Sequence, residues 1–161
     1  MRTPLALAAF CLLSITVPCA AQTFTLNGVA QCPGIAQGRN FALTAGTYHV
    51  EWVSGAYSWV SDDSQFGGFT WLGQARVYIY ATAETLTIGE TVGPLLYATQ
   101  ALAEAAALGI YPIVVSANSV VNFYLPDSGD CGDNRGTITL RFVSPLPTQG
   151  STWGTIKALY R

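Results

Sequence analysis

The segment FTWLGQARVYIYATA, residues 69–83, alternates apolar and polar side chains along its second half. Val77 and Ile79 fall on one side of an extended chain, whereas Arg76 and Tyr78 fall on the other. A two-residue period of this kind is typical of a β-strand with one buried face. The segment therefore predicts a strand that packs on a core through Val77 and Ile79 and shows Arg76 and Tyr78 to the outside.

Further β-branched and aromatic segments precede and follow it, separated by turns rich in Gly, Asn, Asp and Ser. They are FTLNGVA (24–30), NFALTAGTYHVEWV (40–53, interrupted at Gly46), TLTI (85–88), YPIVVSA (111–117), SVVNFYL (119–125) and GTITLRFV (136–143). Strands at this spacing predict an all-β fold, an antiparallel β-sandwich of jelly-roll type. The Ala- and Leu-rich segment 95–109, which ends at Gly109, predicts one short helix inserted at an end of the sandwich.

The chain begins with Met1 and Arg2, followed by the apolar run 5–17 and by small residues up to Ala21. This pattern is typical of a secretory signal peptide, residues 1–21, cleaved after Ala21. The apolar run is too short to span a bilayer, and no later stretch is longer. We therefore expect a protein without a transmembrane anchor that is secreted, periplasmic or on the cell surface of a bacterium.

The predicted sandwich domain occupies residues 22–144 and is followed by a linker, 145–150. The last segment, STWGTIKALYR (151–161), fits either a capped terminal helix or a final strand. Similar short endings occur on some exported bacterial proteins, so a sorting tag is an alternative interpretation of this segment.

Cys32 and Cys131 are the two cysteines that lie beyond the predicted signal peptide. An even pair of cysteines in an oxidising compartment predicts a disulfide. The alternative, a metal site built on the two thiols, would need neighbouring Cys or His residues that the sequence does not supply.

Charged residues are scarce. They make up 10% of the chain, and the formal net charge is −2, whereas about 25% is usual. This composition argues against a nucleic-acid partner. A surface that is polar through Ser, Thr, Asn, Gln and Gly suits neutral ligands, or other copies of the chain in a homo-oligomer.

The loop before the last predicted strand, within PDSGDCGDNRGTITLRF (126–142), concentrates acidic residues. Asp127, Asp130 and Asp133 are three of the nine acidic residues of the chain, and Asn134 adds an amide. Carboxylate and amide oxygens are the ligands that Ca²⁺ prefers, and clustered carboxylates repel one another unless a cation neutralises them. The loop therefore predicts a calcium site. The alternative is a solvated turn, because Asp, Asn and Gly are also common turn residues.

The run DSGDCGDNRG (127–136), followed by an alternating strand, resembles the C-terminal signature of calcium-dependent, galactose-binding bacterial lectins of jelly-roll type. It is also similar to the related domains of PEP-CTERM-type exported proteins. The segments FALTAGTYHVEWVSGAYSWV (41–60) and VVNFYLPDS (120–128) fit the same domain, so that the resemblance covers about residues 24–143.

The resemblance implies a calcium ion that in turn binds two sugar hydroxyls. By motif match, the ion would be held by the Asp127 carboxylate, the Asp130 backbone, Asp133 and Asn134. A further carbonyl would come from residues 54–57. The resemblance thus implies both a cofactor, Ca²⁺, and a carbohydrate partner.

Aromatic residues are concentrated in EWVSGAYSWVSDDSQFGGFTWLG (51–73). Rings beside carboxylates suit sugars, because a ring packs on the C–H face and carboxylates accept bonds from hydroxyls. The candidate ligand-binding residues are those at or near the glycine-rich bends, namely Tyr57, Trp59, Asp62, Asp63 and Trp71. The alternative is that the rings build the core, as we expect for Tyr48 and Trp52, and that the two aspartates form a solvated loop tip.

Catalytic patterns are weak in this sequence. The single histidine, His49, shares a strand face with Glu51, but no Ser or Cys lies in a nucleophile motif. We therefore predict a non-enzymatic, exported carbohydrate-binding module of lectin-like type with a calcium site. The alternative is a structural or self-assembling cell-envelope or extracellular protein in which calcium only rigidifies a loop.

Overall fold

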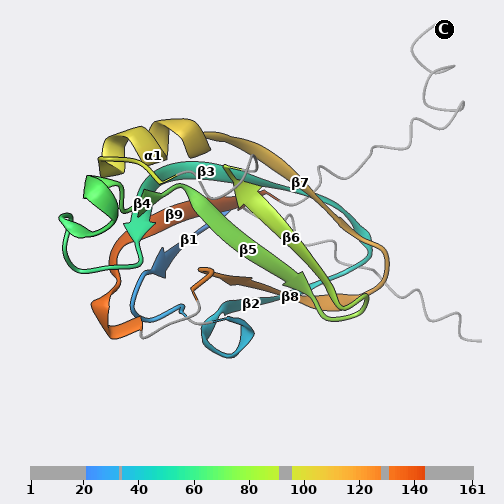
Figure 1. The fold of residues 1–161 in the computed structure, drawn as a ribbon. Coiled ribbons are helices and arrows are strands. Elements are labelled where there is room, and N and C mark those ends of the chain that lie inside the picture. The colour runs from blue at the N-terminus through green and yellow to red at the C-terminus, as the bar shows by residue number, and fades with distance from the viewer. Residues whose placement is uncertain (1–20, 33, 91–95, 128–130, 144–161) are drawn as a thin grey trace, which may run out of the picture.

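The computed structural model describes residues 21–32, 34–90, 96–127 and 131–143, which form strands with a single α-helix (Figure 1). The predicted signal peptide up to residue 20, the linker and the C-terminal segment lie outside these residues. The strands are β1 (Gln22–Asn27), β2 (Arg39–Leu43), β3 (Gly46–Ser58), β4 (Trp71–Leu72), β5 (Gln74–Ile79), β6 (Glu84–Gly89), β7 (Gly109–Val115), β8 (Ser119–Tyr124) and β9 (Arg135–Val143). The helices are α1 (Gln100–Ala107) and the short 3₁₀ segments η1 (Ile35–Gln37), η2 (Gln65–Gly68) and η3 (Cys131–Asp133).

The strands form two antiparallel sheets packed face to face. In sheet A the order is β1-β9-β3, and the far edge of the long strand β3 pairs with β7 along its first half and with β4 at its end. In sheet B the order is β2-β8-β5-β6. The pairs are nested, first strand with last, second with eighth, third with seventh and fifth with sixth. This nesting is the jelly-roll arrangement, and it confirms the predicted fold class.

The core lies between the sheets and is built by the alternating faces of the strands. Val77 and Ile79 are buried, as predicted, whereas Arg76 and Tyr78 are only partly buried on the outer face of sheet B. The rings at the centre pack at centroid distances of 4.7 to 6.2 Å. They belong to Phe24, Phe41, Tyr48, Phe123 and Phe142.

Two glycines lie where predicted strand segments divide. The segment 40–53 splits into β2 and β3, and β3 begins at Gly46, where the interruption was predicted. The predicted strand 69–83 splits at Gly73, which packs against α1, because a Cβ there would lie 2.3 Å from the Ala103 carbonyl oxygen. Only glycine allows the chain to approach the helix this closely.

The helix expected over 95–109 is confirmed but shorter. It is capped by Thr99, whose side chain accepts a hydrogen bond from the Leu102 amide at 3.3 Å. It ends at Ala107, so Gly109 does not terminate it as predicted but begins β7. Tertiary pairing with β3 therefore takes the glycine into the sheet.

Strand β3 carries a bulge that redirects its second half. The β3–β9 register shifts between Trp52 and Ser54, and Gly55 has a φ of +86°. A Cβ on Gly55 would lie 2.1 Å from the Thr137 carbonyl oxygen. After the bulge four consecutive residues, 55–58, are buried. The alternation of buried and exposed side chains along β3 therefore ends at the bulge, and Tyr57 lies in the buried run that follows.

Candidate binding pocket

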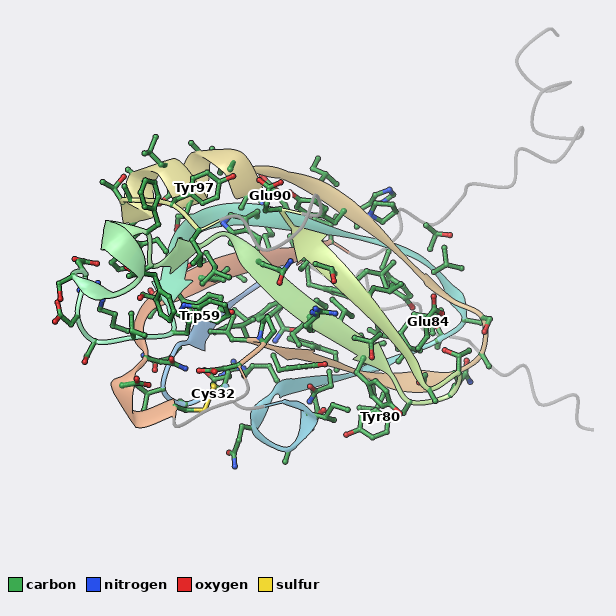
Figure 2. All side chains as sticks on the ribbon, viewed as in Figure 1. Cys32, Trp59, Tyr80, Glu84, Glu90 and Tyr97 are labelled. Atoms are coloured by element: carbon green, nitrogen blue, oxygen red, sulfur yellow. A yellow bond between two sulfur atoms is a disulfide. The ribbon has the colours of Figure 1, made fainter. Side chains whose placement is uncertain are left out.

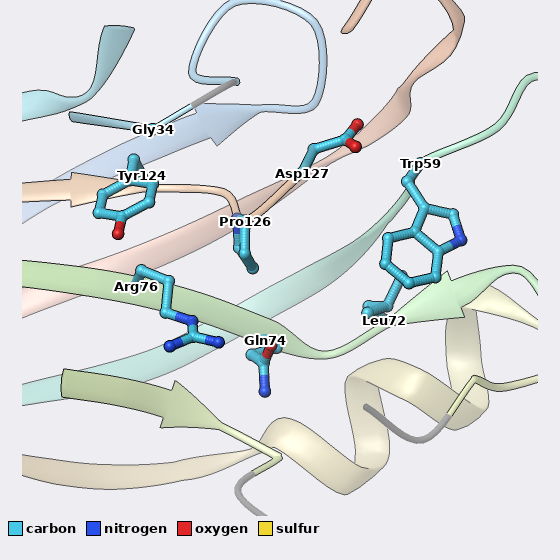
Figure 3. A pocket seen from close by; sticks show the side chains of 8 residues that line it. All are labelled: Gly34, Trp59, Leu72, Gln74, Arg76, Tyr124, Pro126 and Asp127. Atoms are coloured by element: carbon cyan, nitrogen blue, oxygen red, sulfur yellow. The ribbon is translucent and has the colours of Figure 1, made fainter. Parts of the chain in front are cut away.

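A pocket of about 540 Å³ opens beside the outer face of sheet B, at the end of the sandwich where β8 finishes (Figure 3). Its volume lies within the range of about 300 to 1,000 Å³ that is usual for ligand sites. The lining residues are Gly34, Trp59, Leu72, Gln74, Arg76, Tyr124, Pro126 and Asp127.

Sheet B supplies one side of the pocket. Gln74 and Arg76 are two residues apart on β5, on the face opposite the buried Ala75 and Val77. Arg76 stands opposite Tyr124 in the β5–β8 register. The same alternation that builds the core therefore brings an amide, a guanidinium and a phenol together on the outside.

The loop after β8 brings Pro126 and Asp127 to the pocket wall. Two hydrogen bonds tie this loop to neighbouring parts of the chain. The Tyr57 hydroxyl donates a hydrogen bond to the Pro126 carbonyl oxygen at 2.6 Å. The Leu125 amide donates to the Gln31 carbonyl oxygen at 3.0 Å. These bonds join it to β3 and to the loop that carries Gly34, so the pocket wall is held in place before a ligand arrives.

The disulfide between Cys32 and Cys131 adds a covalent tie at the same place and confirms the predicted pairing. Its Cα atoms are 5.7 Å apart across a sequence separation of 99 residues. The Asp127 carboxylate lies next to the two sulfurs, within 4.8 Å. The bond therefore joins the two loops that bring Gly34 and Asp127 to the pocket.

The segment around η1 is held on the outer face of sheet B by a buried amide. The Nδ2 atom of Asn122 donates to the Ile35 carbonyl oxygen at 3.1 Å and to Asn40 Oδ1 at 2.7 Å. Gly38 permits this approach, since a Cβ there would lie 2.1 Å from Asn122 Oδ1. One wall of the pocket thus depends on contacts between residues that are far apart in sequence.

The charges of the pocket come from Arg76 and Asp127. Among the described residues, Arg76 forms no hydrogen bond or ion pair, and its Nε atom is buried. Burial raises the pKa of Tyr57; the Asp127 carboxylate raises it further, and Arg76 acts in the opposite direction. Both charged groups therefore lie near the Tyr57 hydroxyl.

The structure divides the candidate sugar residues of the 51–73 segment. Trp59 lines the pocket, as a ligand-binding role requires. Tyr57 does not lie at the surface: it is 0% exposed and supports the pocket from within the core. The bulge at Gly55 is the physical reason, because β3 continues past this glycine and buries Tyr57, whereas the sequence predicts a bend near the surface there.

Two of the other three candidates, Asp63 and Trp71, belong to a cluster that joins the 60–70 loop to β9, outside the pocket lining. Asp63 accepts a hydrogen bond from Thr70 Oγ1 at 2.9 Å and pairs with Arg135. The Arg135 guanidinium lies 4.8 Å from the ring centroid of Trp71. The Thr70 hydroxyl and then Arg135 lower the pKa of Asp63, so its carboxylate stays ionised. We call this group, Asp63, Thr70, Trp71 and Arg135, the latch.

Asp62 is exposed beside the latch and is engaged locally. Its carboxylate accepts bonds from the Ser64 amide at 2.8 Å and from the Ser64 hydroxyl at 2.7 Å. These bonds lower the pKa of Asp62. The residue therefore shapes a loop turn outside the pocket.

Glu51, which shares a strand face with His49, is bound to a different partner. Its carboxylate accepts a hydrogen bond from Arg141 Nε at 2.7 Å across the β3–β9 pair. His49 and Glu51 therefore lie on the outer face of sheet A, where Arg141 neutralises the charge of Glu51.

The residues predicted to bind calcium differ in how deeply the structure buries them, and one of them is not described. Asp130 lies outside the described residues, and Asp133 is exposed in η3. Asn134 is 5% exposed; its Nδ2 donates to the Gly28 carbonyl oxygen at 3.1 Å, and its buried Oδ1 has no partner among the described residues. An oxygen of this kind fits the donor set that calcium takes. Calcium binding stays a prediction.

In the part of the chain that the structure describes, three side chains of the Cys, His, Asp and Glu types converge closely enough to share an ion. They are Cys32, Asp127 and Cys131. Because the two sulfurs are joined in the disulfide, neither provides the thiolate that a soft metal ion requires.

No described helix has the length and apolar character needed to cross a membrane.

Sequence reasoning missed most of the pocket. No sequence pattern predicts a ligand role for the lining residues Leu72, Gln74, Arg76, Tyr124 and Pro126, and the acidic loop predicts a calcium role for Asp127. A signal was present, since the outward position of Arg76 followed from the alternation of 69–83. Its neighbour Tyr124 lies 48 positions further along, and only the β5–β8 register joins them.

Comparison with known proteins returned no relative: no protein family model matches the chain, nor does any curated protein or solved structure. The resemblance to calcium-dependent lectins therefore stays an expectation that rests on the residues 41–60 and 120–136.

Proposed function

We propose that this protein is an exported, non-catalytic carbohydrate-binding module and that the pocket beside Trp59 is its sugar site. The observation that carries the proposal is the composition of the lining. The lining combines an indole, a phenol, a guanidinium, a carboxylate and an amide around about 540 Å³ (Figure 3). Ligand sites are typically apolar hollows with a few placed polar groups. A sugar ring needs both an aromatic face and partners for its hydroxyls.

The polar groups of the pocket favour binding over hydrolysis. Asp127 is the one carboxylate among the described lining residues. Hydrolysis of a glycosidic bond by the usual route needs two carboxyl groups that flank the bond. Asp127 and Gln74 suit the recognition of hydroxyls instead, because a carboxylate accepts hydrogen bonds and an amide both donates and accepts them.

Export is supported by the signal-like start of the chain and by the disulfide, since such bonds persist mainly in oxidising compartments. The calcium site forms part of the proposal. Asp127, Asp133, Asn134 and the Asp130 backbone would hold the ion. When bound there, it would neutralise the clustered carboxylates and rigidify the loop that carries Asp127.

A test of the metal uses thermal unfolding. Millimolar calcium is expected to raise the Tm of the wild type and to leave the Tm of Asp133→Ala unchanged, with magnesium as the control ion. Equal responses of the two proteins would contradict the assignment of the loop.

The rival function, a structural or self-assembling envelope protein, has one observation in its favour. Strand β7 pairs only with β3 among the described strands, and its outer side chains Ile110 and Val114 are 65% and 61% exposed. Exposed apolar side chains on a sheet edge favour association with another chain.

A glycan array with and without chelator separates the two functions. The wild type is expected to bind a set of glycans, and Trp59→Ala is expected to lose them. Tyr80→Ala is the matched control, because Tyr80 is an aromatic side chain, 50% exposed, at the opposite end of β5 (Figure 2). Binding that Trp59→Ala leaves intact would refute the pocket as the sugar site. Glycan-independent assembly, measured by light scattering, would support the rival.

A further inference from the structure

Arg76 is a partly buried cation that forms no ion pair with the residues that the structure describes. Among the described residues it has neither an ion pair nor a hydrogen bond, although Asp127 lines the same pocket. A desolvated charge is costly unless it is paired. An anionic group of a ligand would therefore be a suitable partner for the Arg76 guanidinium.

The other arginines within the described ranges do not share this condition. Arg135 pairs with Asp63, and Arg141 pairs with Glu51. Arg39 is exposed at the start of β2, where water solvates its charge. Of the described arginines, Arg76 alone combines partial burial, a place in the pocket and the lack of a carboxylate partner.

The two charges of the pocket are separated in a way that orients a ligand. Figure 3 shows Arg76 and Tyr124 on one side and Trp59 on the opposite side, with Asp127 and Gln74 between them. Gln74 Nε2 donates to the Glu90 carbonyl oxygen at 3.1 Å, which fixes its amide next to Arg76 on β5. A ligand with an anionic end would place that end at Arg76 and away from Asp127.

We propose that the sugar bound in this pocket carries a carboxylate, as in a uronic-acid unit of an acidic polysaccharide, and that Arg76 binds this carboxylate. The proposal rests on the proposed carbohydrate function and narrows its ligand class. The planar guanidinium matches a carboxylate through two parallel hydrogen bonds. Trp59 offers its ring to the sugar, and Asp127 and Gln74 offer side-chain oxygen atoms to its hydroxyls.

A comparison of matched ligands tests the proposal on the wild-type protein. The probes are oligosaccharides of galacturonate, glucuronate, mannuronate and guluronate, each as the free carboxylate and as its neutral methyl ester, with calorimetry as the readout. We expect at least one carboxylate form to bind about tenfold or more tightly than its ester, since a hydrogen-bonded charge contributes more than a neutral group. Added salt is expected to reduce this preference.

Variants locate the preference. Arg76→Gln is expected to bring the carboxylate form to the affinity of the ester, whereas Arg76→Lys retains part of the preference because the charge remains without the planar fork. Arg141→Gln is the matched control, since it removes an arginine from the outer face of sheet A. Thermal unfolding of each variant reports whether it folds. If Arg76→Gln fails to fold, the ligand comparison on the wild type still decides.

The outcomes separate this inference from the proposed function. Esters that bind as well as carboxylates would overturn the inference and leave the sugar site standing. The inference would also fail, with the sugar site intact, if Arg76→Gln weakened both forms equally, or if sulfated sugars bound and carboxylates did not. Absence of binding by every sugar, neutral and acidic, would overturn both.

Discussion

Two arginine–tryptophan neighbourhoods of this molecule use the same side chains in opposite ways. In the latch, Arg135 lies over the ring of Trp71 and is neutralised by Asp63. In the pocket, Arg76 and Trp59 line a hollow, and no described residue neutralises the arginine. In the first neighbourhood the arginine's charge is paired within the chain and joins two parts of it, whereas in the second the arginine's charge has no described ion-pair partner and is open to a ligand.

Residue type alone therefore does not identify a binding site. The 51–73 segment has the aromatic and acidic composition of a sugar site, yet the latch engages Asp63 and Trp71. Only Trp59 of that segment's candidates reaches the pocket. A charged side chain can contribute to binding where it lines a hollow and its charge is not paired within the fold, and that condition depends on neighbours from other strands.

The largest expected effect comes from the disulfide, which lies beside the pocket and ties its loops together. The double variant Cys32→Ser with Cys131→Ser is expected to lose about 2 to 5 kcal/mol of unfolding free energy. It is also expected to weaken sugar binding, because the loops that carry Gly34 and Asp127 are no longer joined. Urea unfolding and calorimetry measure the two effects. A stability unchanged from that of the wild type would contradict the expected role.

The second prediction compares the two tryptophans directly. Trp59→Ala is expected to reduce sugar affinity by at least about tenfold, or about 1.4 kcal/mol, and to lower Tm as well, because its partly buried ring packs against the core. Trp71→Ala is expected to lower Tm, because the ring loses its packing and its contact with Arg135, and to leave affinity unchanged. If Trp71→Ala lost binding as strongly as Trp59→Ala, the division into latch and pocket would be wrong.

The third prediction concerns the anchor under the pocket. Tyr57→Phe keeps the buried ring and removes the hydrogen bond to the Pro126 carbonyl oxygen. We expect a loss of about 1 kcal/mol of unfolding free energy and a reduction of sugar affinity of a few fold. Tyr48→Phe is the control, because its hydroxyl bonds to Thr44, which does not line the pocket. Equal effects on binding would argue against Tyr57 as a positioning residue.

The smallest effect is expected from the exposed ion pair of the latch. Asp63→Asn should lower Tm slightly at neutral pH and leave sugar binding unchanged. Because the pKa of Asp63 is lowered from 3.8, its contribution is present above that value and is lost as the pH falls through the lowered pKa. The Tm difference between wild type and variant should therefore vanish in strong acid. A difference that persists there would have another cause.

The fold class was predictable because its determinants are local. Alternation in 69–83 placed Val77 and Ile79 in the core, and the pair Cys32 and Cys131 predicted the disulfide. The short helix was predicted from its composition, although its end was not, since Gly109 pairs with Trp52 in the sheet. Local patterns hold wherever distant neighbours do not compete with them.

The order of the residues was enough to predict a β-sandwich, the buried face of the strand that carries Val77 and Ile79, and the pairing of two cysteines. Three other features emerged only once the strands were packed: Tyr57 is core, Asp63 pairs with Arg135 over a separation of 72 residues, and Arg76 meets Tyr124 in a pocket. The two groups of features differ in range. The two-residue period of a strand is set by adjacent residues. A binding site depends instead on which charges stay unpaired, and which rings stay uncovered, after distant strands have packed.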